Sequence, residues 1–212
     1  KFNKYSHGLG AGDINGDGLV DVIERSGWWE QPKNWDKATP WTFHPFPFSP
    51  GKGGAQMFAY DIDGDGDNDV VTSMDGHGYG LSWFEQIEDG AEITFKEHIV
   101  MTNRTEDNPY GVSFSQLHAM SMADIDNDGI PDIVTGKCYY AHNGRDPGAE
   151  EPAVLYWFKT QRHADGSAEL VPYRIDDNSG VGRQITTGDL NGDGKMDIVT
   201  SNKKGVFAFI QN

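Results

Sequence analysis

The sequence predicts an all-β protein that repeats one unit of antiparallel strands four times, and three observations support this prediction. Four acidic nine-residue segments align without gaps, a β-branched run follows each of them, and the 27 Gly and 10 Pro residues favour short strands joined by tight turns. The acidic segments are "DINGDGLVD" (13–21), "DIDGDGDND" (61–69), "DIDNDGIPD" (124–132) and "DLNGDGKMD" (189–197), and their starts lie 48, 63 and 65 residues apart. A unit that recurs at such intervals is typical of an array of supersecondary modules.

The surroundings of the acidic segments repeat as well, and they predict the strands in order. A first strand of small residues precedes each segment, at 7–12, 56–60, 118–123 and 183–188. A second, β-branched strand follows the turn, at 20–24, 69–73, 132–136 and 197–201. A third, aromatic strand comes next, at 27–31, 81–86, 154–159 and 205–211. Three units continue with a fourth strand, at 41–46, 93–100 and 169–175.

The first acidic segment also fits the EF-hand calcium loop, because Glu24 stands at its twelfth position. An EF-hand needs an amphipathic helix on each side of the loop. Here three glycines precede the loop and Val22 and Ile23 follow it, a pattern that favours strands. The other three segments have threonine at the position of Glu24. We therefore expect an EF-like loop on a β scaffold.

Four-stranded antiparallel units in series predict a β-propeller. We expect blades at about residues 5–47, 54–101, 115–176 and 182–212, the last without its outer strand. Two interpretations remain for ring closure. Either the chain is part of a larger propeller of six to eight blades, or it is a four-bladed propeller that closes through Phe2–Tyr5. We favour the larger propeller because the segment available upstream, Lys1–Ser6, is short and polar.

The charge of the chain excludes several partners. Its 33 acidic and 17 basic residues give a formal net charge of −16, which disfavours binding to nucleic acids and to anionic membranes.

No apolar run of about 20 residues is present, so no membrane span is expected. The lone cysteine, Cys138, excludes an internal disulfide and has no obvious activating partner.

The acidic segments match the needs of Ca²⁺, which takes six to eight hard oxygen ligands. Positions 1, 3, 5 and 9 offer side-chain oxygens, position 7 offers its backbone carbonyl, and the glycine at position 6 permits the turn. The expected ligands are Asp13, Asn15, Asp17, Leu19, Asp21, Asp61, Asp63, Asp65, Asp67, Asp69, Asp124, Asp126, Asp128, Ile130, Asp132, Asp189, Asn191, Asp193, Lys195 and Asp197. We expect up to four structural Ca²⁺ ions, because Mg²⁺ demands rigid octahedral geometry and Zn²⁺ suits all-oxygen loops poorly. The alternative is a solvated Asp/Gly turn, which four loops in register disfavour.

The D-x-[DN]-x-D-G-x-x-D loop between a small-residue strand and a D-[IV]-V strand resembles the FG-GAP/VCBS-type repeat of integrin-α-like propellers. The resemblance covers nearly the whole chain, although the string "FG-GAP" itself is absent. It implies the propeller fold but leaves the function open, because the family includes adhesion modules, lectin-like modules and polysaccharide-active enzymes. It also implies an exported, periplasmic or extracellular protein. The weak calcium binding of extracellular modules, with a Kd of roughly 10⁻⁴–10⁻³ M, agrees with that setting.

A second constellation appears six residues before each acidic segment. This position holds His7, His118 and Arg183 in three units and Ala55 in the second unit. In a propeller it starts the innermost strand near the central channel, so these side chains can bind an anionic sugar or a metal, or move protons. Further candidate ligand-binding residues lie in the neighbouring loops: His77, Tyr79, Tyr139, Tyr140 and His142. In the alternative interpretation, each imidazole only hydrogen-bonds nearby backbone.

Two classes of function follow. The first is a calcium-stabilised, non-catalytic module whose loops bind a carbohydrate or protein partner, and we favour it. The second is a carbohydrate-active enzyme of lyase or dehydratase type, with His7, His118 and Arg183 around a pocket at the channel mouth. Imidazoles on one shared pocket would favour the enzyme, whereas outward-facing imidazoles would exclude it.

Overall fold

A computed structural model of the chain describes residues 7–36, 38–89 and 92–212. The described residues form an all-β protein of fifteen strands with two short 3-10 helices. The closing segment considered above, Phe2–Tyr5, lies outside these residues. Strands flank the first acidic loop on both sides, so the EF-hand alternative is excluded. Among the described elements no helix has the length and apolar composition needed to cross a membrane.

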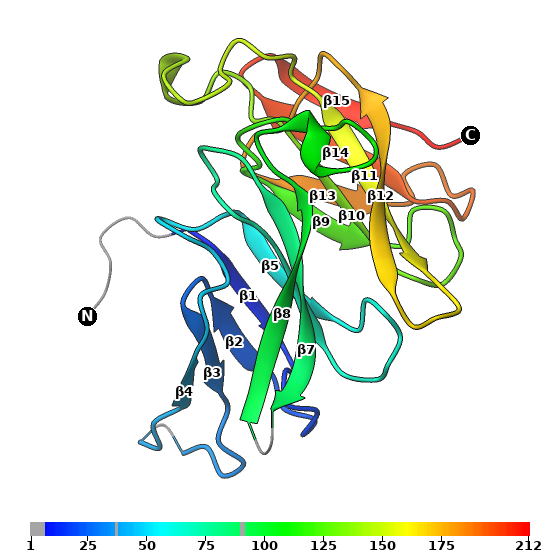
Figure 1. The fold of residues 1–212 in the computed structure, drawn as a ribbon. Helices are drawn as coiled ribbons and strands as arrows, with labels where there is room; N and C mark the ends of the chain where they lie inside the picture. The colour runs from blue at the N-terminus through cyan, green and yellow to red at the C-terminus, as the bar shows by residue number, and fades with distance from the viewer. Residues whose placement is uncertain (1–6, 37, 90–91) are drawn as a thin grey trace.

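The strands follow the predicted order in every unit (Figure 1). The first unit contains β1 (Leu9–Gly12), β2 (Asp21–Glu24), β3 (Gly27–Glu30) and β4 (Thr42–Pro45). The second contains β5 (Gln56–Tyr60), β6 (Asp69–Ser73), β7 (Leu81–Asp89) and β8 (Glu92–Met101). The third contains β9 (Met120–Ala123), β10 (Asp132–Gly136), β11 (Leu155–Arg162) and β12 (Ala168–Asp176). The fourth contains β13 (Ile185–Gly188), β14 (Asp197–Asn202) and β15 (Gly205–Phe209). The 3-10 helices are η1 (Thr105–Asp107) and η2 (Ala141–Asn143).

Each unit is an antiparallel meander, but the first two units share one sheet. The third and fourth units form separate sheets of four and three strands, whereas β1 and β5 pair in parallel and join eight strands in the order β4-β3-β2-β1-β5-β6-β7-β8. The missing side chain of Gly10 permits this pairing, because a Cβ atom there would lie 2.3 Å from the backbone oxygen of Met57. Four separate blades were expected, so the shared sheet is a departure from the prediction.

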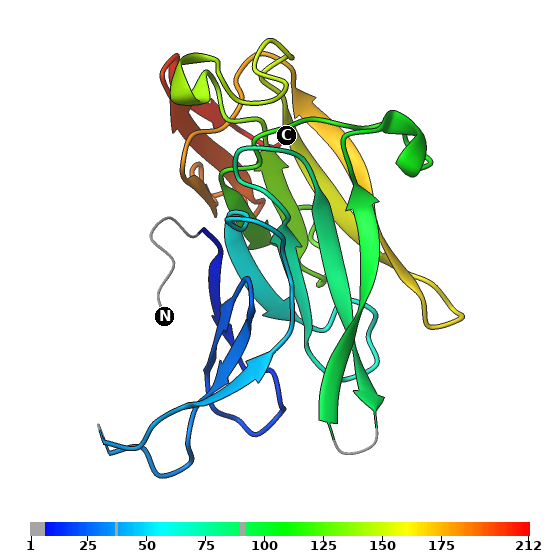
Figure 2. The same ribbon diagram turned by 60° about the vertical axis from the view of Figure 1, so that its left-hand side comes forward.

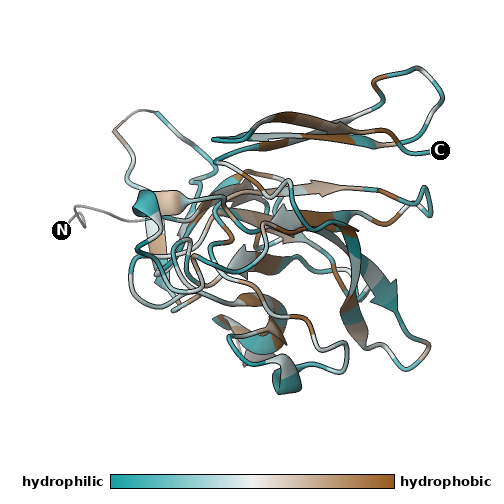
Figure 3. Cartoon of the chain, turned by 90° about the horizontal axis from the view of Figure 1, so that it is seen from above, coloured by the Kyte–Doolittle hydropathy of each residue, from teal (hydrophilic) through white to brown (hydrophobic). Residues whose placement is uncertain are grey.

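Three apolar layers fill the spaces between successive units, and alternating residues of the strands supply them. In β6, Val70 faces the first unit and Val71 faces the third. In β10, Ile133 faces the second unit and Val134 faces the fourth. In Figure 3 the hydrophobic residues accordingly lie mainly along the strands. This period of two is the signature of strands that are buried on both faces.

The connections divide the molecule into two ends. The acidic loops all join a first strand to a second strand, so they lie at one end of the units. The residues before the first strands and after the second strands meet at the opposite end. In the turned view of Figure 2, the yellow-green segment 137–152 of this end lies beside the red strands of the last unit. A first strand of four or five residues separates the two ends by about 15 Å.

Candidate functional site

Each acidic loop is closed by a buried aspartate at its ninth position. In the second unit, Asp69 is 1 % exposed and accepts two backbone hydrogen bonds, one from Ile62 N (2.8 Å) and one from Gln86 N (2.8 Å). The carboxylate therefore ties its loop to the third strand. The equivalent carboxylates make the same pair of bonds: Asp21 with Ile14 and Gln31, Asp132 with Ile125 and Thr160, and Asp197 with Leu190 and Gln211.

The turn itself has the same local geometry in the different units. In the first loop Asp13 accepts hydrogen bonds from Asp17 N (3.1 Å) and Gly18 N (2.8 Å), and the third and fourth loops repeat both. Positions 4 and 6 have positive φ in every loop. Glycine fills seven of these eight positions and Asn127 fills the eighth, as left-handed backbone requires.

The carboxylates of the second loop are crowded and partly desolvated. Burial and the neighbouring carboxylates raise the pKa of Asp67 to about 6, and burial raises the pKa of Asp69 to about 7. In addition, Asp67 Oδ1 in this loop and Asp17 Oδ2 in the first loop are buried, and neither has a hydrogen-bond partner among the described residues. A cation bound in each of these two loops would satisfy its unpaired oxygen.

Two of the loops bring three carboxylates within reach of one ion. The groups Asp61–Asp63–Asp69 and Asp124–Asp126–Asp132 each have oxygens within 4.8 Å of one another. The first and fourth loops carry an amide, Asn15 or Asn191, at the third position, and an amide oxygen is also a calcium ligand. The ligand roles of the twenty predicted residues stay a prediction.

A lysine pairs closely with two carboxylates of the third loop, whereas Arg162 approaches the second loop more loosely, with its Nη2 atom 3.8 Å from Asp61 Oδ1. Lys159 of β11 donates hydrogen bonds from Nζ to Asp126 and to Asp128, the latter at 2.7 Å. This ammonium lowers the pKa of Asp128. The equivalent position on the third strand holds Glu30 in the first unit and Glu85 in the second. The sequence reasoning missed Lys159, although its place beside the loop follows from the strand alignment.

At the opposite end, three imidazoles from three different units meet. His7 precedes β1, His77 lies between β6 and β7, and His118 precedes β9. Their ring centroids form a near-equilateral triangle with sides of 5.0, 5.1 and 4.8 Å. The Nε2 atoms of His7 and His77 are 3.3 Å apart. The predicted His7–His118 pair is therefore present, and His77 joins it.

Two further residues extend this cluster. His142 lies beside His77, with ring centroids 4.4 Å apart, and Asp146 accepts from Nδ1 of both rings, at 3.2 Å from His77 and 3.1 Å from His142. His77 and Asp146 are 69 residues apart in the chain, so no sequence signal pointed to their contact.

Two members of the cluster, His7 and His118, favour the neutral imidazole. His118 is 9 % exposed, and its burial, together with His77, His7 and Arg183, lowers its pKa to about 4. Burial, His77 and Arg183 also lower the pKa of His7. Neutral imidazoles are competent as bases and as metal ligands.

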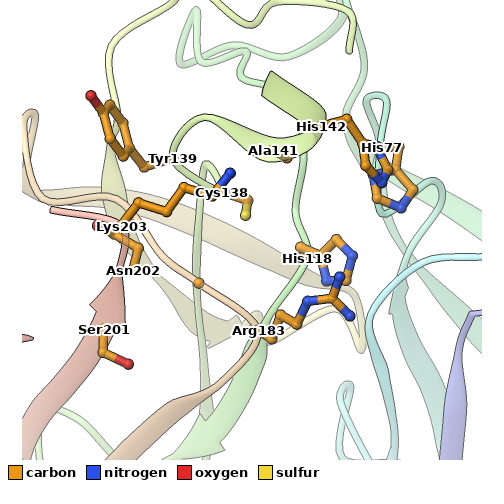
Figure 4. A pocket seen from close by; sticks show the side chains of 11 residues that line it. His77, His118, Cys138, Tyr139, Ala141, His142, Arg183, Ser201, Asn202 and Lys203 are labelled. Atoms are coloured by element: carbon orange, nitrogen blue, oxygen red, sulfur yellow. The ribbon is translucent and has the colours of Figure 1, made fainter. Parts of the chain in front are cut away.

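Two cavities share the wall made by His118 and Arg183. The larger, of about 530 Å³, is bounded by His77, His142, Tyr139 and Lys203 as well, and Figure 4 shows His118 and Arg183 side by side with Tyr139 and Lys203 across from them. The smaller, of about 280 Å³, includes His7. The predicted convergence of His7, His118 and Arg183 is thus seen in the geometry.

The predicted tyrosines have different surroundings. Tyr139 borders the larger cavity, whereas Tyr140 is 47 % exposed and lies under the Lys203 ammonium, 5.3 Å from its ring centroid. Tyr79 lies outside this cavity and donates its hydroxyl to Glu151 Oε1 at 2.5 Å. Cys138 is buried, and burial raises the pKa of its thiol, which makes it unreactive.

Comparison with protein families assigns repeats to the chain. A model described as an FG-GAP-like repeat matches residues 61–135, and a model described as an FG-GAP repeat matches residues 181–206. Comparison with curated proteins gave no match. The first match includes the second and third acidic loops, and the second match includes the fourth.

Proposed function

Because the chain carries FG-GAP-type repeats, we propose that it is a calcium-stabilised module of a β-propeller that binds an anionic carbohydrate in the histidine–arginine pocket. The observation that carries this proposal is the division into two ends. One end repeats the same acidic loop in all four units, and the other gathers cationic and imidazole side chains from different units around one cavity. Repeats of this kind typically occur in exported or extracellular proteins, and we propose that setting here.

The acidic loops fit calcium by their donor set, which consists of oxygens only, and by the orphaned oxygens of Asp17 and Asp67. Bound calcium would stabilise the charged carboxylates of the second loop, whose pKa values are raised first by burial and then by mutual repulsion. The residues that would hold the ions are those predicted from the sequence, with the Asp67 side chain as an additional oxygen donor. In the third loop, Lys159 competes with an ion for Asp126 and Asp128.

The pocket favours an anionic ligand. In a chain of net charge −16, its wall carries the guanidinium of Arg183 and the ammonium of Lys203. Arginine pairs with a carboxylate through two parallel hydrogen bonds, and Tyr139 offers an aromatic face for a sugar ring. Oligosaccharides that contain uronic acids combine both features.

The test is a calorimetric titration in millimolar calcium with oligogalacturonate and with a neutral oligosaccharide of equal length. We expect binding of the acidic oligosaccharide only, and a loss of at least about tenfold in affinity for Arg183→Gln, which removes one charge-assisted contact. The matched control is Arg174→Gln, because the exposed Arg174 only approaches Asp177. Equal affinity of wild type and Arg183→Gln for the acidic ligand would refute the proposed site.

A second candidate is a polysaccharide lyase, and one observation favours it. The ring centroids of His7 and His118 are 5.1 Å apart, and both residues line a cavity with Arg183. A base and a cation for the oxyanion therefore lie within reach of one ligand. His118 would take the proton from the carbon next to a uronate carboxylate while Arg183 stabilises the resulting oxyanion. The C–O bond to the leaving sugar then breaks, a C=C bond forms, and the leaving oxygen takes a proton from His7 or water. Ultraviolet absorption of the unsaturated product on incubation with polyuronate tests this candidate; its absence leaves the binding module.

The outer face of the last unit supports a larger propeller. Ile14, Ile62 and Ile125 are at most 4 % exposed at the second loop position, whereas the equivalent Leu190 is 55 % exposed. We propose that a further blade packs against this face in the functional protein. A longer chain that contains such a blade should protect Leu190 from solvent.

A further inference from the structure

We propose that His7, His77 and His118 form a binding site for one divalent transition-metal ion of the zinc class, separate from the acidic loops. The three side chains belong to three different units, so the site depends on their packing and not on a local motif. Three ligating nitrogens lie within 4.8 Å of one another.

The distance between two of the nitrogens matches a shared metal. A tetrahedral ion with nitrogen ligands at 2.0–2.1 Å places two of them about 3.3–3.4 Å apart. The Nε2 atoms of His7 and His77 are 3.3 Å apart and face each other. Without a metal, this separation requires a proton shared between the rings, and a metal ion would replace that proton.

The third nitrogen is free to complete the shell. His118 is 9 % exposed, and its Nε2 is buried with no hydrogen-bond partner in the described part of the chain. A buried polar atom without a partner destabilises the folded state, and coordination to a metal would satisfy it. The centroid of the His118 ring lies 5.1 Å from that of His7 and 4.8 Å from that of His77.

A carboxylate orients one of the ligands. Asp146 Oδ2 accepts from Nδ1 of His77 at 3.2 Å, which leaves Nε2 of the same ring directed at His7. A carboxylate behind a metal-binding histidine fixes its tautomer and raises its basicity. Asp75 also contacts this region, through a hydrogen bond to His77 N at 2.8 Å. These two anions offset the nearby charge of Arg183.

The donor set selects the class of metal. Imidazole nitrogens favour Zn²⁺, Co²⁺, Ni²⁺ and Cu²⁺ over Ca²⁺ and Mg²⁺, which prefer oxygen. Three protein ligands leave one position open, as in zinc sites that bind water or a substrate. His77 and His118 border the larger cavity together with Arg183 (Figure 4), so a position open to this cavity would take water or an anionic oxygen.

This proposal shares its pocket with the proposed function but does not need the carbohydrate, because the metal ion alone is the probe. The histidine site is also electrostatically independent of the acidic loops. About 15 Å of strand lies between the two ends, and salt screens charges beyond a Debye length of about 8 Å at physiological ionic strength. Ligation of His118 Nε2 and its use as a general base exclude each other, so a metal here would argue against the lyase candidate.

The experiment is a zinc titration of protein that has been stripped with chelator, dialysed and saturated with calcium to fill the acidic loops. A competing chromogenic chelator reports the affinity, and Co²⁺ substitution reports the ligand geometry by its visible spectrum. We expect one Zn²⁺ per chain and the intense absorption of four-coordinate Co²⁺.

Three variants and one control decide the outcome. His77→Asn and His118→Asn should lower zinc affinity by more than the roughly 10–100-fold that loss of an outer carboxylate causes, and Asp146→Asn should fall within that range. His163→Asn is the matched control, because His163 pairs with Glu169 at 3.2 Å at the surface, away from the cluster. Circular dichroism verifies that each variant is folded. If His118→Asn does not fold, the partly exposed His7 supplies the replacement variant, His7→Asn.

Any of three results would overturn the proposal. The first is a wild-type protein that binds no Zn²⁺ once calcium fills the loops. The second is zinc binding that is the same in the histidine variants and in His163→Asn, and the third is a Co²⁺ spectrum of a six-coordinate oxygen site. Failure of carbohydrate binding alone would leave the metal site standing.

Discussion

Replacing Lys159 by glutamine should raise the calcium affinity of the third acidic loop. The Lys159 ammonium bonds Asp126 and Asp128, so an ion in this loop must displace it or lie beside it. Its side chain and those of both partners are 24 to 32 % exposed, so the interaction is only partly shielded from water.

The magnitude follows from the charges. Two unit charges 4 Å apart interact by about 1 kcal/mol in water, so an ammonium at that distance opposes a divalent ion by about 2 kcal/mol. This energy corresponds to roughly 30-fold in Kd. Salt screening reduces the effect, and we expect a gain of about 10- to 30-fold in the calcium affinity of this loop for Lys159→Gln.

The assay combines a calcium titration against a chromophoric chelator with thermal unfolding. Without calcium, Lys159→Gln should destabilise the protein by up to about 1 kcal/mol, because two carboxylates lose their counter-ion. In millimolar calcium that loss should vanish or reverse. Arg104→Gln is the control, since Arg104 pairs with Glu106 at 3.0 Å in the connection after β8, which belongs to no acidic loop. Unchanged calcium binding in Lys159→Gln, or destabilisation of equal size with and without calcium, would refute the reasoning.

Three further predictions concern the scaffold. Asp69→Asn should lower the free energy of urea unfolding in millimolar calcium by about 1–3 kcal/mol, because its new NH₂ group faces one of two buried backbone N–H donors. In chelator, the raised pKa of Asp69, about 7, means that the folded state holds this proton more tightly than the unfolded state. The wild type should therefore lose stability relative to Asp69→Asn as the pH rises from about 4 to 7, and a constant difference would contradict this. Gly12→Ala should destabilise the protein by about 1–3 kcal/mol in the same urea assay, since its Cβ would lie 2.4 Å from the Ala59 Cβ. The equivalent Gly188→Ala has open space and should cost nothing, so equal losses in both variants would exclude the close approach of β1 and β5 as the cause.

The strands could be predicted because their signals are local. Val70 and Val71 show the alternation of a strand buried on both faces, and the glycine at position 6 marks each turn. The observed strand ends differ from the expected ones by only a few residues. For example, β7 was expected at 81–86 and extends to Asp89. The repeated unit thus carries most of its structure in its own sequence.

The contacts between units could not be predicted, because they depend on packing between distant segments. The parallel pairing of β1 with β5 follows from the close approach at Gly10, which the sequence shows only as one more glycine. Alignment of the acidic loops placed His7 and His118 at one position of the unit, but the contact of His77 with Asp146 joins two loops of unrelated sequence. Such contacts become visible only when the units are arranged in space.

The separation of the two ends also makes the scaffold suitable for engineering. The loops at the pocket end differ in length and sequence between units, from the two-residue turns at 25–26 and 203–204 to the long segment at 137–154. Each doubling of a flexible loop costs only about 0.6 kcal/mol of closure entropy. New peptide loops grafted at this end would thus meet a rigid support whose ion-dependent turns remain untouched, and the number of usable graft sites grows with the number of units.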